Sequence, residues 1–541
     1  MCRGGLKLLF ENGLNLVGSK FIAILFAFLM APVADCGPEH SFQLMETSIE
    51  DVHKAMLEAT LTCHELVQQY LDRIRAYDQQ GPALKAMLYV NPRSLQEADA
   101  MDQEFRRTHK LKPLGCIPIV LKDNFDTADM PTTAGALTLK GAQPDRDAFA
   151  VKRLREAGAL ILGKANMSEF ATGGISASSL GGQVKNPYDL TRTPGGSSGG
   201  TGAAVAANLA AVGTGSDTGG SIRSPASATS LVGLRPTRGL ISRDGIVPVS
   251  FTQDTIGPMT RNVADAAAVL DAMVGYDPND PVTALSVGNV PKTYTAFLQN
   301  GLKGARLGVL ANGFGHGPEY EEVNKVMARA IEALKEQGAV IVPVEDKVLD
   351  IDTLTANFRM NEPEFKAALN HYLQEQGSHV PVHSLAEIIA SGQYYKPTLE
   401  KFFKVTEAYE DGPNSPDYRE RRIKMEEIKI EVANLMAKNQ LDALVYPHQK
   451  CLVLPIGATF QKDRNGVIAA LTGFPAIEVS AGYSTPTADA PIGVPVGLEL
   501  LGRAWAEPEL IKLAYGFEQA THLRKPPVST PALNATQNVK P

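Results

Sequence analysis

The chain has 541 residues, which is long enough for several small domains or for one large α/β enzyme. Apolar residues make up 44% of the chain and charged residues 21%, a globular balance that excludes a disordered or fibrous protein. The net charge of −7 provides none of the basic surplus that phosphate backbones require, so we expect no nucleic-acid partner.

An uncharged apolar run occupies residues 21–31 and follows the basic residues Arg3, Lys7 and Lys20. A basic segment followed by a short apolar run is typical of a secretory signal. The run is about half as long as the roughly 20 residues that a helix needs to span a bilayer. We therefore expect residues 1–36 to be a signal peptide or an N-terminal anchor of a secreted or periplasmic protein. A membrane-anchored or a cytoplasmic protein is the alternative.

Further along the chain, apolar residues recur at helical spacing in some segments and form short continuous runs in others. In chain order we expect two helices within 49–77, a strand at 84–90, a helix at 98–110, a strand at 117–121, a helix at 148–158, a strand at 159–162, a helix at 203–209, a strand at 306–310, a helix at 321–338, a strand at 340–344, a helix at 417–438 and a strand at 443–446. Helices that alternate with short strands predict an α/β fold with a central mixed sheet.

We expect one enzyme-sized domain over residues 45–523. Within it, residues 345–460 form a variable part that we expect to cover the substrate, because the segment up to about residue 415 is more polar and less periodic. Residues 524–541 are rich in proline, threonine and asparagine, which predicts an extended tail.

The cysteines are few and scattered, and their spacing predicts neither a zinc site nor a disulfide framework. They are Cys2, Cys36, Cys63, Cys116 and Cys451. Cys116 lies in an apolar run, so we expect it to be a buried small hydrophobic residue. We also expect no metal and no organic cofactor.

Two serine-bearing glycine clusters occupy residues 193–204 (TPGGSSGGTGAA) and 213–225 (GTGSDTGGSIRSP). Glycines at this density bring no side chains to a core, but they let the backbone approach a ligand and direct consecutive N–H groups into one concavity. Such a concavity holds a phosphate or an oxyanion. The chain lacks the lysine-serine ending and the Gly-x-Gly-x-x-Gly pattern of phosphate loops, so we favour an oxyanion site beside a nucleophilic serine.

Ser197 also fits the Gly-x-Ser-x-Gly elbow of α/β-hydrolases, with Gly195 and Gly199. That elbow needs a buried strand before the serine, whereas a polar stretch precedes this one. It also needs a downstream histidine, and this alternative stays open because several follow: His316, His371, His379, His383, His448 and His522.

All ten histidines lie outside residues 110–315, so a serine in the glycine clusters can take its base from lysine instead. Lys122 ends the apolar run 117–121. Burial there would lower its pKa by disfavouring the ammonium form, and neutral lysine can deprotonate a serine. The alternative is that Lys122 is an ordinary cation at the end of a strand.

The runs GGSSGG, GSDTGGSIR and GLRPTRG, together with IPIVLKDNFDT and LTGFPAIEVSAG, resemble the amidase signature family over about residues 49–521. The resemblance implies a mixed sheet with helices on both faces and a Ser-cisSer-Lys triad. Lys122 would be the base, Ser197 the bridging serine on a cis peptide bond, and Ser221 the nucleophile. The oxyanion hole would consist of backbone N–H groups, which belong to Thr218, Gly219, Gly220 and Ser221.

The resemblance further implies a small-molecule amide as substrate and a serine acyl-enzyme as intermediate. Homodimer formation and membrane association through the N-terminus are further possible interactions. The alternative function is an amidotransferase-type or non-catalytic subunit with the same fold. Residues 171–179 and 345–460 are expected to set substrate selectivity. His448 departs from the family, which usually has a small hydroxyl residue after the proline.

Residues beside the triad are expected to have structural roles. Asp217 and Arg223 are expected to pair and brace the nucleophile loop. Asn166 and Glu169 are expected to orient a neighbouring loop by hydrogen bonds. Ser198 is expected to cap backbone groups and to take no part in the chemistry.

Overall fold

The computed structural model describes residues 42–409 and 412–533. The expected leader at 1–36 and the last eight residues of the expected tail lie outside these residues. From Gln43 onward the chain forms one compact unit.

The centre of this unit is an eleven-stranded mixed sheet, in the order β1-β3-β2-β6-β8-β7-β12-β13-β11-β9-β10. Its strands are β1 (Met87–Val90), β2 (Pro118–Lys122), β3 (Leu160–Ala165), β6 (Val212–Asp217), β7 (Val232–Arg235), β8 (Thr255–Thr260), β9 (Arg306–Leu310), β10 (Val340–Val344), β11 (Ala443–Pro447), β12 (Ala476–Tyr483) and β13 (Pro495–Leu501). The strands β3, β2 and β6 run parallel to one another, and β6 pairs antiparallel with β8. A two-stranded sheet, β4 (Ala177–Ser178) and β5 (Gly182–Gln183), lies apart from it.

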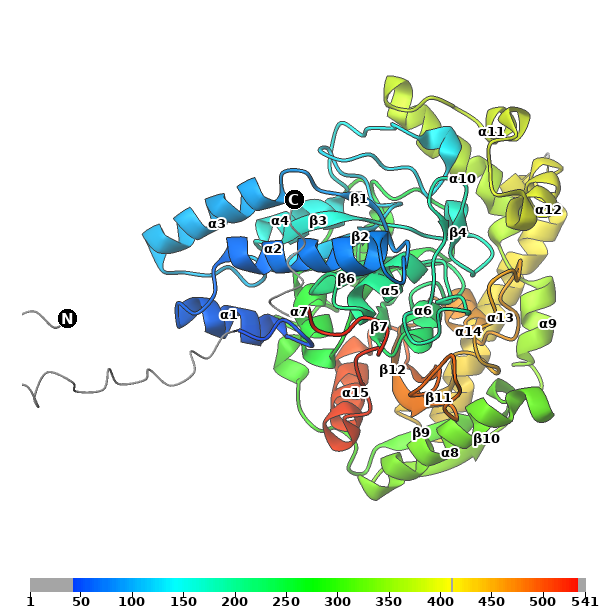
Figure 1. The fold of residues 1–541 in the computed structure, drawn as a ribbon. Helices are drawn as coiled ribbons and strands as arrows, with labels where there is room; N and C mark the ends of the chain where they lie inside the picture. The colour runs from blue at the N-terminus through cyan, green and yellow to red at the C-terminus, as the bar shows by residue number, and fades with distance from the viewer. Residues whose placement is uncertain (1–41, 410–411, 534–541) are drawn as a thin grey trace, which may run out of the picture. The chain divides into compact units, whose positions relative to one another are not determined.

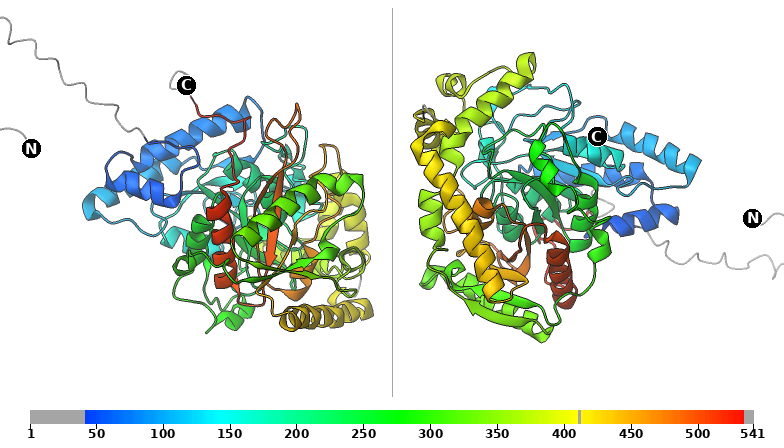
Figure 2. Two further views of the ribbon diagram at one scale, coloured as in Figure 1. Left: turned by 90° about the horizontal axis from the view of Figure 1, so that it is seen from below. Right: turned by 180° about the vertical axis from the view of Figure 1, so that it is seen from behind.

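Helices cover both faces of the sheet, which confirms the expected fold class (Figure 1). They are α1 (Ile49–Leu57), α2 (Cys63–Arg73), α3 (Ser94–Thr108), α4 (Phe149–Glu156), α5 (Gly199–Ala206), α6 (Arg223–Ala228), α7 (Val263–Met273), α8 (Glu321–Glu336), α9 (Ile351–Asn357), α10 (Asn361–Gln376), α11 (Leu385–Ser391), α12 (Lys396–Glu407), α13 (Pro416–Lys438), α14 (Val467–Thr472) and α15 (Glu507–Thr521). Helices α1–α3 and α9–α13 lie at opposite sides of this unit, as the views in Figure 2 agree. None of the helices in the described residues is long and apolar enough to cross a membrane.

The two helices expected within 49–77 are present, and each begins at a capping box. Ser48 caps α1 with Asp51, and Thr62 caps α2 with Glu65, so the first backbone N–H groups of each helix are satisfied. The apolar positions that predicted both helices are buried, except for Leu57 at the end of α1, which is 64% exposed.

Helix α5 begins inside the first glycine cluster, four residues before the predicted start. A Cβ atom at Gly200 would lie 2.0 Å from the carbonyl oxygen of Asn166, and one at Gly199 would lie 2.2 Å from Ser176 Oγ. These glycines therefore let α5 pack tightly against the loop after β3. The sequence argument that glycines serve only the approach of a ligand was wrong for this half of the cluster.

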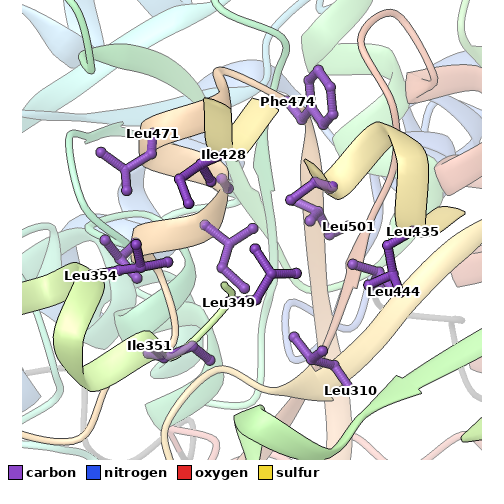
Figure 3. Close-up of a cluster of buried hydrophobic side chains, with 14 of the residues drawn as sticks. Leu310, Leu349, Ile351, Leu354, Ile428, Leu435, Leu444, Leu471, Phe474 and Leu501 are labelled. Carbon is purple, nitrogen blue, oxygen red and sulfur yellow. The ribbon is translucent and has the colours of Figure 1, made fainter. Parts of the chain in front are cut away.

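The segment 345–460 is mainly helical and shares a buried core with the central sheet. Helices α9, α13 and α14 pack against β9, β11 and β13 through a buried apolar cluster that includes Leu354, Ile428, Leu444 and Leu471 (Figure 3). This core anchors the helices next to the sheet.

Cys63 and Cys116 form a disulfide between the start of α2 and the residues before β2, which the cysteine spacing did not predict. Cys116 is buried, as expected, but as half of a disulfide and not as a free hydrophobic residue. The two residues are 53 positions apart, and tertiary structure brings their Cα atoms to 5.7 Å. Spacing along the chain could not reveal this pair. Cys451 is free and buried.

The described part of the tail, residues 524–533, includes a turn at 528–530 and is anchored to the domain. Arg73, which is buried, donates hydrogen bonds to the carbonyl groups of Thr530 and Pro531. Arg524 pairs with Glu46 at 2.8 Å.

Candidate active site

Lys122 is the last residue of β2 and is completely buried. Its neighbour β6 runs parallel to β2 and ends at Asp217, so the two strands end at the same edge of the sheet. Ser197 lies in the loop before α5, and Ser221 lies in the turn between β6 and α6. The fold therefore gathers the three predicted residues at one edge.

The amino group of Lys122 contacts two hydroxyl groups. Its Nζ atom lies 2.7 Å from Ser197 Oγ and 2.7 Å from Ser216 Oγ. The side-chain amide of Asn124 donates a hydrogen bond to the same Ser216 Oγ at 3.0 Å. Sequence reasoning missed Ser216 and Asn124. The strand pairing of β2 with β6 is the signal that could have found them, since both residues lie at the strand ends around Lys122.

Burial lowers the pKa of Lys122 to about 7, because the ammonium form loses its hydration. Asp217 and Asp254 favour the charged form, but they only partly offset burial. Among the described residues no carboxylate lies within salt-bridge distance of Lys122. A large fraction of this lysine is therefore neutral at pH 7 and able to accept a proton.

The peptide bond between Gly196 and Ser197 is cis, as the family resemblance implied. The backbone around it is held on both sides, because Ser197 O accepts a bond from Ser168 N at 3.0 Å and Gly196 O accepts one from Arg464 at 3.1 Å. Ser198 N donates to Ser221 O at 3.2 Å, which joins the segments of the bridging and nucleophilic serines.

Asp217 organises the turn that carries Ser221. Its carboxylate accepts the backbone N–H of Gly220 at 2.7 Å and that of Ile222 at 3.1 Å. It also pairs with the buried Arg223 and Arg235. Although burial opposes ionisation, the two guanidinium groups hold the pKa of Asp217 well below its usual range. The expected Asp217–Arg223 brace is present.

The hydrogen bond from Gly220 N–H to Asp217 removes one donor from the expected oxyanion hole. The Gly220 N–H points at a carboxylate and is not free for a ligand, which differs from the sequence expectation. The N–H groups of Thr218, Gly219 and Ser221 have no acceptor within the part of the chain that the structure describes. Thr218 donates its hydroxyl to Asp254 at 2.6 Å, which fixes the turn from the other side.

His448 packs behind the turn and does not contact Ser197. A Cβ atom at Gly220 would lie 2.7 Å from the His448 ring, so only glycine fits there. His448 Nδ1 lies 2.6 Å from Glu499, and burial lowers the pKa of the ring, which favours neutral imidazole. Ser197, the serine of the Gly-x-Ser-x-Gly pattern, contacts Lys122. This contact removes the basis for the α/β-hydrolase alternative, which needs a histidine at that position.

Glu478 lies beside His448 and Glu499, and together they are the one metal-sized group of ligand atoms among the described residues. Glu499 already accepts bonds from Arg223 and Tyr446. The fixed charge of Arg223 repels a cation at this position. Burial and the nearby charge of Glu499 raise the pKa of Glu478 well above its usual range, which favours its neutral, protonated form.

Asn166 and Glu169 form hydrogen bonds that orient the neighbouring loop, as expected. Asn166 donates from its side-chain amide to the carbonyl groups of Lys85 and Gly182. Glu169 accepts the backbone N–H groups of Ser179 and Tyr395.

A cavity of about 70 Å³ opens in front of Ser221. An outer groove of about 380 Å³ shares part of its lining with this cavity. The linings come from both expected selectivity segments, 171–179 and 345–460. The residues common to both spaces are Thr172, Gly173, Arg359, Asn361 and Phe460.

Comparison with known proteins finds a family match, similar sequences and similar solved structures that agree with one another. Residues 65–511 match the Amidase family. A probable amidase of Arabidopsis thaliana is 38% identical over 510 residues, which cover 90% of this chain and 92% of that protein. One component of the glutamyl-tRNA(Gln) amidotransferase of Thermoanaerobacter pseudethanolicus is 32% identical over 500 residues, with 90% and 98% covered. The X-ray structure of native peptide amidase from Stenotrophomonas maltophilia is 40% identical with a TM-score of 0.81, and 90% and 99% are covered.

Proposed function

The chain belongs to the amidase family, and on this premise we propose that it hydrolyses carboxylic amides through a serine acyl-enzyme. Ser221 is the nucleophile, Ser197 is the bridging hydroxyl and Lys122 is the base. The observation that carries the proposal is the 2.7 Å contact of Lys122 Nζ with Ser197 Oγ, made by a lysine whose pKa burial lowers to about 7.

In this mechanism neutral Lys122 accepts the proton of Ser197, and Ser197 accepts the proton of Ser221. Ser221 Oγ then forms a bond to the carbonyl carbon of the amide. The negative charge that develops on the carbonyl oxygen is stabilised by the N–H groups of Thr218, Gly219 and Ser221, because donors that are already held in place need no reorganisation during the reaction.

The same relay returns the proton to the nitrogen of the leaving group as the carbon–nitrogen bond breaks. Ammonia or an amine departs, and Ser221 remains linked to the acyl group. Water then donates a proton to the relay and attacks the ester, which releases the carboxylic acid and restores all three residues.

We further propose that the substrates are C-terminal amides of peptides. The support is the 40% identity to a peptide amidase over nearly the whole of both chains. An open groove that leads into a narrow cavity suits a peptide that enters with its terminal amide first.

The test is ammonia release from short peptide amides by the wild type and by Lys122→Ala and Ser221→Ala. Each variant should lose activity by a factor on the order of 10³ or more, because groups that act as one relay fail together. A fluorophosphonate should label Ser221 in the wild type.

Ser198→Ala is the matched control, since it removes a neighbouring buried hydroxyl that donates to the carbonyl of Ser216 at 3.3 Å and that the proposed relay does not use. Activity in Lys122→Ala close to that of the wild type would reject the lysine as base.

The second candidate is an amidotransferase-type subunit, and the relative from an amidotransferase, at 32% identity, favours it. Such a protein would release little ammonia from free peptide amides and would hydrolyse glutamine only with a partner chain. Turnover of peptide amides by the purified chain alone would decide against it.

A further inference from the structure

We infer that the active-site cavity selects substrates that carry a negative charge, namely peptide amides with an acidic side chain at or next to the amidated residue. The charge would be bound by Arg359, at the junction of the cavity with the outer groove. This inference rests on the proposed function and narrows its substrate class.

Arg359 follows α9 and lines both spaces. Its side chain is half-buried, yet its guanidinium group has no acceptor and no carboxylate within bonding distance in the described residues. Several other half-buried arginines are paired: Arg155 with Asp129, Arg243 with Asp280, and Arg524 with Glu46. A half-buried cation without a partner is unusual and indicates a site for an anion.

A second guanidinium group lines the same cavity. Arg464 donates to the carbonyl of Gly196, and burial together with the charge of Arg359 lowers the pKa of Arg464 to about 10. The carboxylate that lines this cavity, Asp463, is already paired with Lys462 at 3.3 Å. Positive charge is therefore in excess beside Ser221.

Apart from Arg359, the charges of the outer groove balance, since it contains the carboxylate of Glu362 and the amine of Lys401. The uncompensated charge thus lies where the two spaces meet. A substrate carboxylate there would form charge-assisted bonds to a planar guanidinium group and would relieve the repulsion between the two arginines.

The position also limits where the acidic group sits on the substrate. Arg359 lines the same narrow cavity as Ser221, so the bound charge lies within one or two residues of the amide that is cleaved. Phe460, 44% exposed, lines both spaces and offers an apolar wall for the rest of the peptide.

The experiment compares three peptide amides that differ only in the penultimate residue, which is Glu, Gln or Lys. For the wild type, kcat/KM should be about tenfold higher for Glu than for its neutral isostere Gln, and lowest for Lys. Salt should reduce the Glu-to-Gln ratio because it screens a half-exposed charge pair.

Arg359→Gln should bring the Glu-to-Gln ratio close to one, and Arg359→Glu should favour the Lys peptide. Lys404→Gln is the control, because it removes an exposed cation of α12 that pairs with Glu400 at 3.0 Å. That variant should keep the wild-type ratio. An unchanged ratio in Arg359→Gln would overturn the inference.

Binding to Ser221→Ala separates this inference from the proposed function. Its dissociation constants for the three peptides, measured by calorimetry, should follow the same order without any turnover. Equal constants, or no binding, would overturn the charge selectivity. Failure of the wild type to release ammonia from any of the peptides would instead count against the proposed amidase activity.

Discussion

The strand-end region around Lys122 and the helical segment 345–460 build the same cavity in different ways. In the strand-end region, the polar side chains are buried and many are bonded to one another, and Asp217 alone binds two backbone N–H groups and two arginines. In the helical segment, the lining side chains of Arg359 and Phe460 are partly exposed and largely without polar partners. The first arrangement fixes reacting groups, and the second leaves groups free for a ligand.

The largest expected effect comes from breaking the first region at Asp217. Asp217→Asn would leave Arg223 and Arg235 without their shared counter-charge in a buried site, which should cost about 3–5 kcal/mol of unfolding free energy. Activity should fall with it, because the turn that carries Ser221 would lose its anchor. Chemical denaturation and peptide-amide turnover would measure the two effects.

Asp99→Asn is the matched control for that variant. Asp99 pairs with His64 on the surface, where both side chains are about half exposed. An exposed pair contributes about 0–1 kcal/mol, so this variant should behave like the wild type. Equal stability losses in the two variants would contradict the role given to Asp217.

A smaller effect should appear in the pH profile. The base acts only when neutral, and burial lowers the pKa of Lys122 to about 7, so kcat/KM should rise with pH and level off above about 7. Below that pH the rate should fall about tenfold for each unit, because protonated lysine cannot accept the proton. A profile that is flat between pH 5 and 8 would contradict the assignment of this base.

The smallest effect is expected in the helical segment. Phe460→Ala should raise KM for peptide amides about fivefold, equivalent to about 1 kcal/mol of lost apolar contact, and should leave kcat nearly unchanged. Phe251→Ala, at 40% exposure, is the control because Phe251 does not line the cavity of Ser221. A drop in kcat for Phe460→Ala would mean that the two regions are less independent than the structure implies.

The sequence predicted those site residues that stand out by their type and by their immediate neighbours along the chain. Lys122 stood at the end of an apolar run, and Ser221 followed consecutive glycines. Ser216 escaped notice because a serine in a strand is ordinary until pairing places it beside a lysine. The Gly220 N–H was misassigned since a backbone group shows its direction only in three dimensions.

The same contrast holds for the fold. Local apolar periodicity predicted α1 and α2 because it depends on neighbours along the chain. The start of α5 was misplaced because close packing against Asn166, and not helix propensity, accounts for glycine there. The disulfide was missed for a similar reason, since 53 residues separate its cysteines.

The bond between Cys63 and Cys116 closes a loop that contains α2, β1 and α3. A closed loop of this length reduces the entropy of the unfolded chain by the equivalent of about 4 kcal/mol. The loop includes the edge strand of the sheet and none of the residues proposed for the relay. Reduction of this disulfide would therefore destabilise the edge of the sheet at β1 first. The stability of the protein would then depend on the redox potential of the compartment in which it resides.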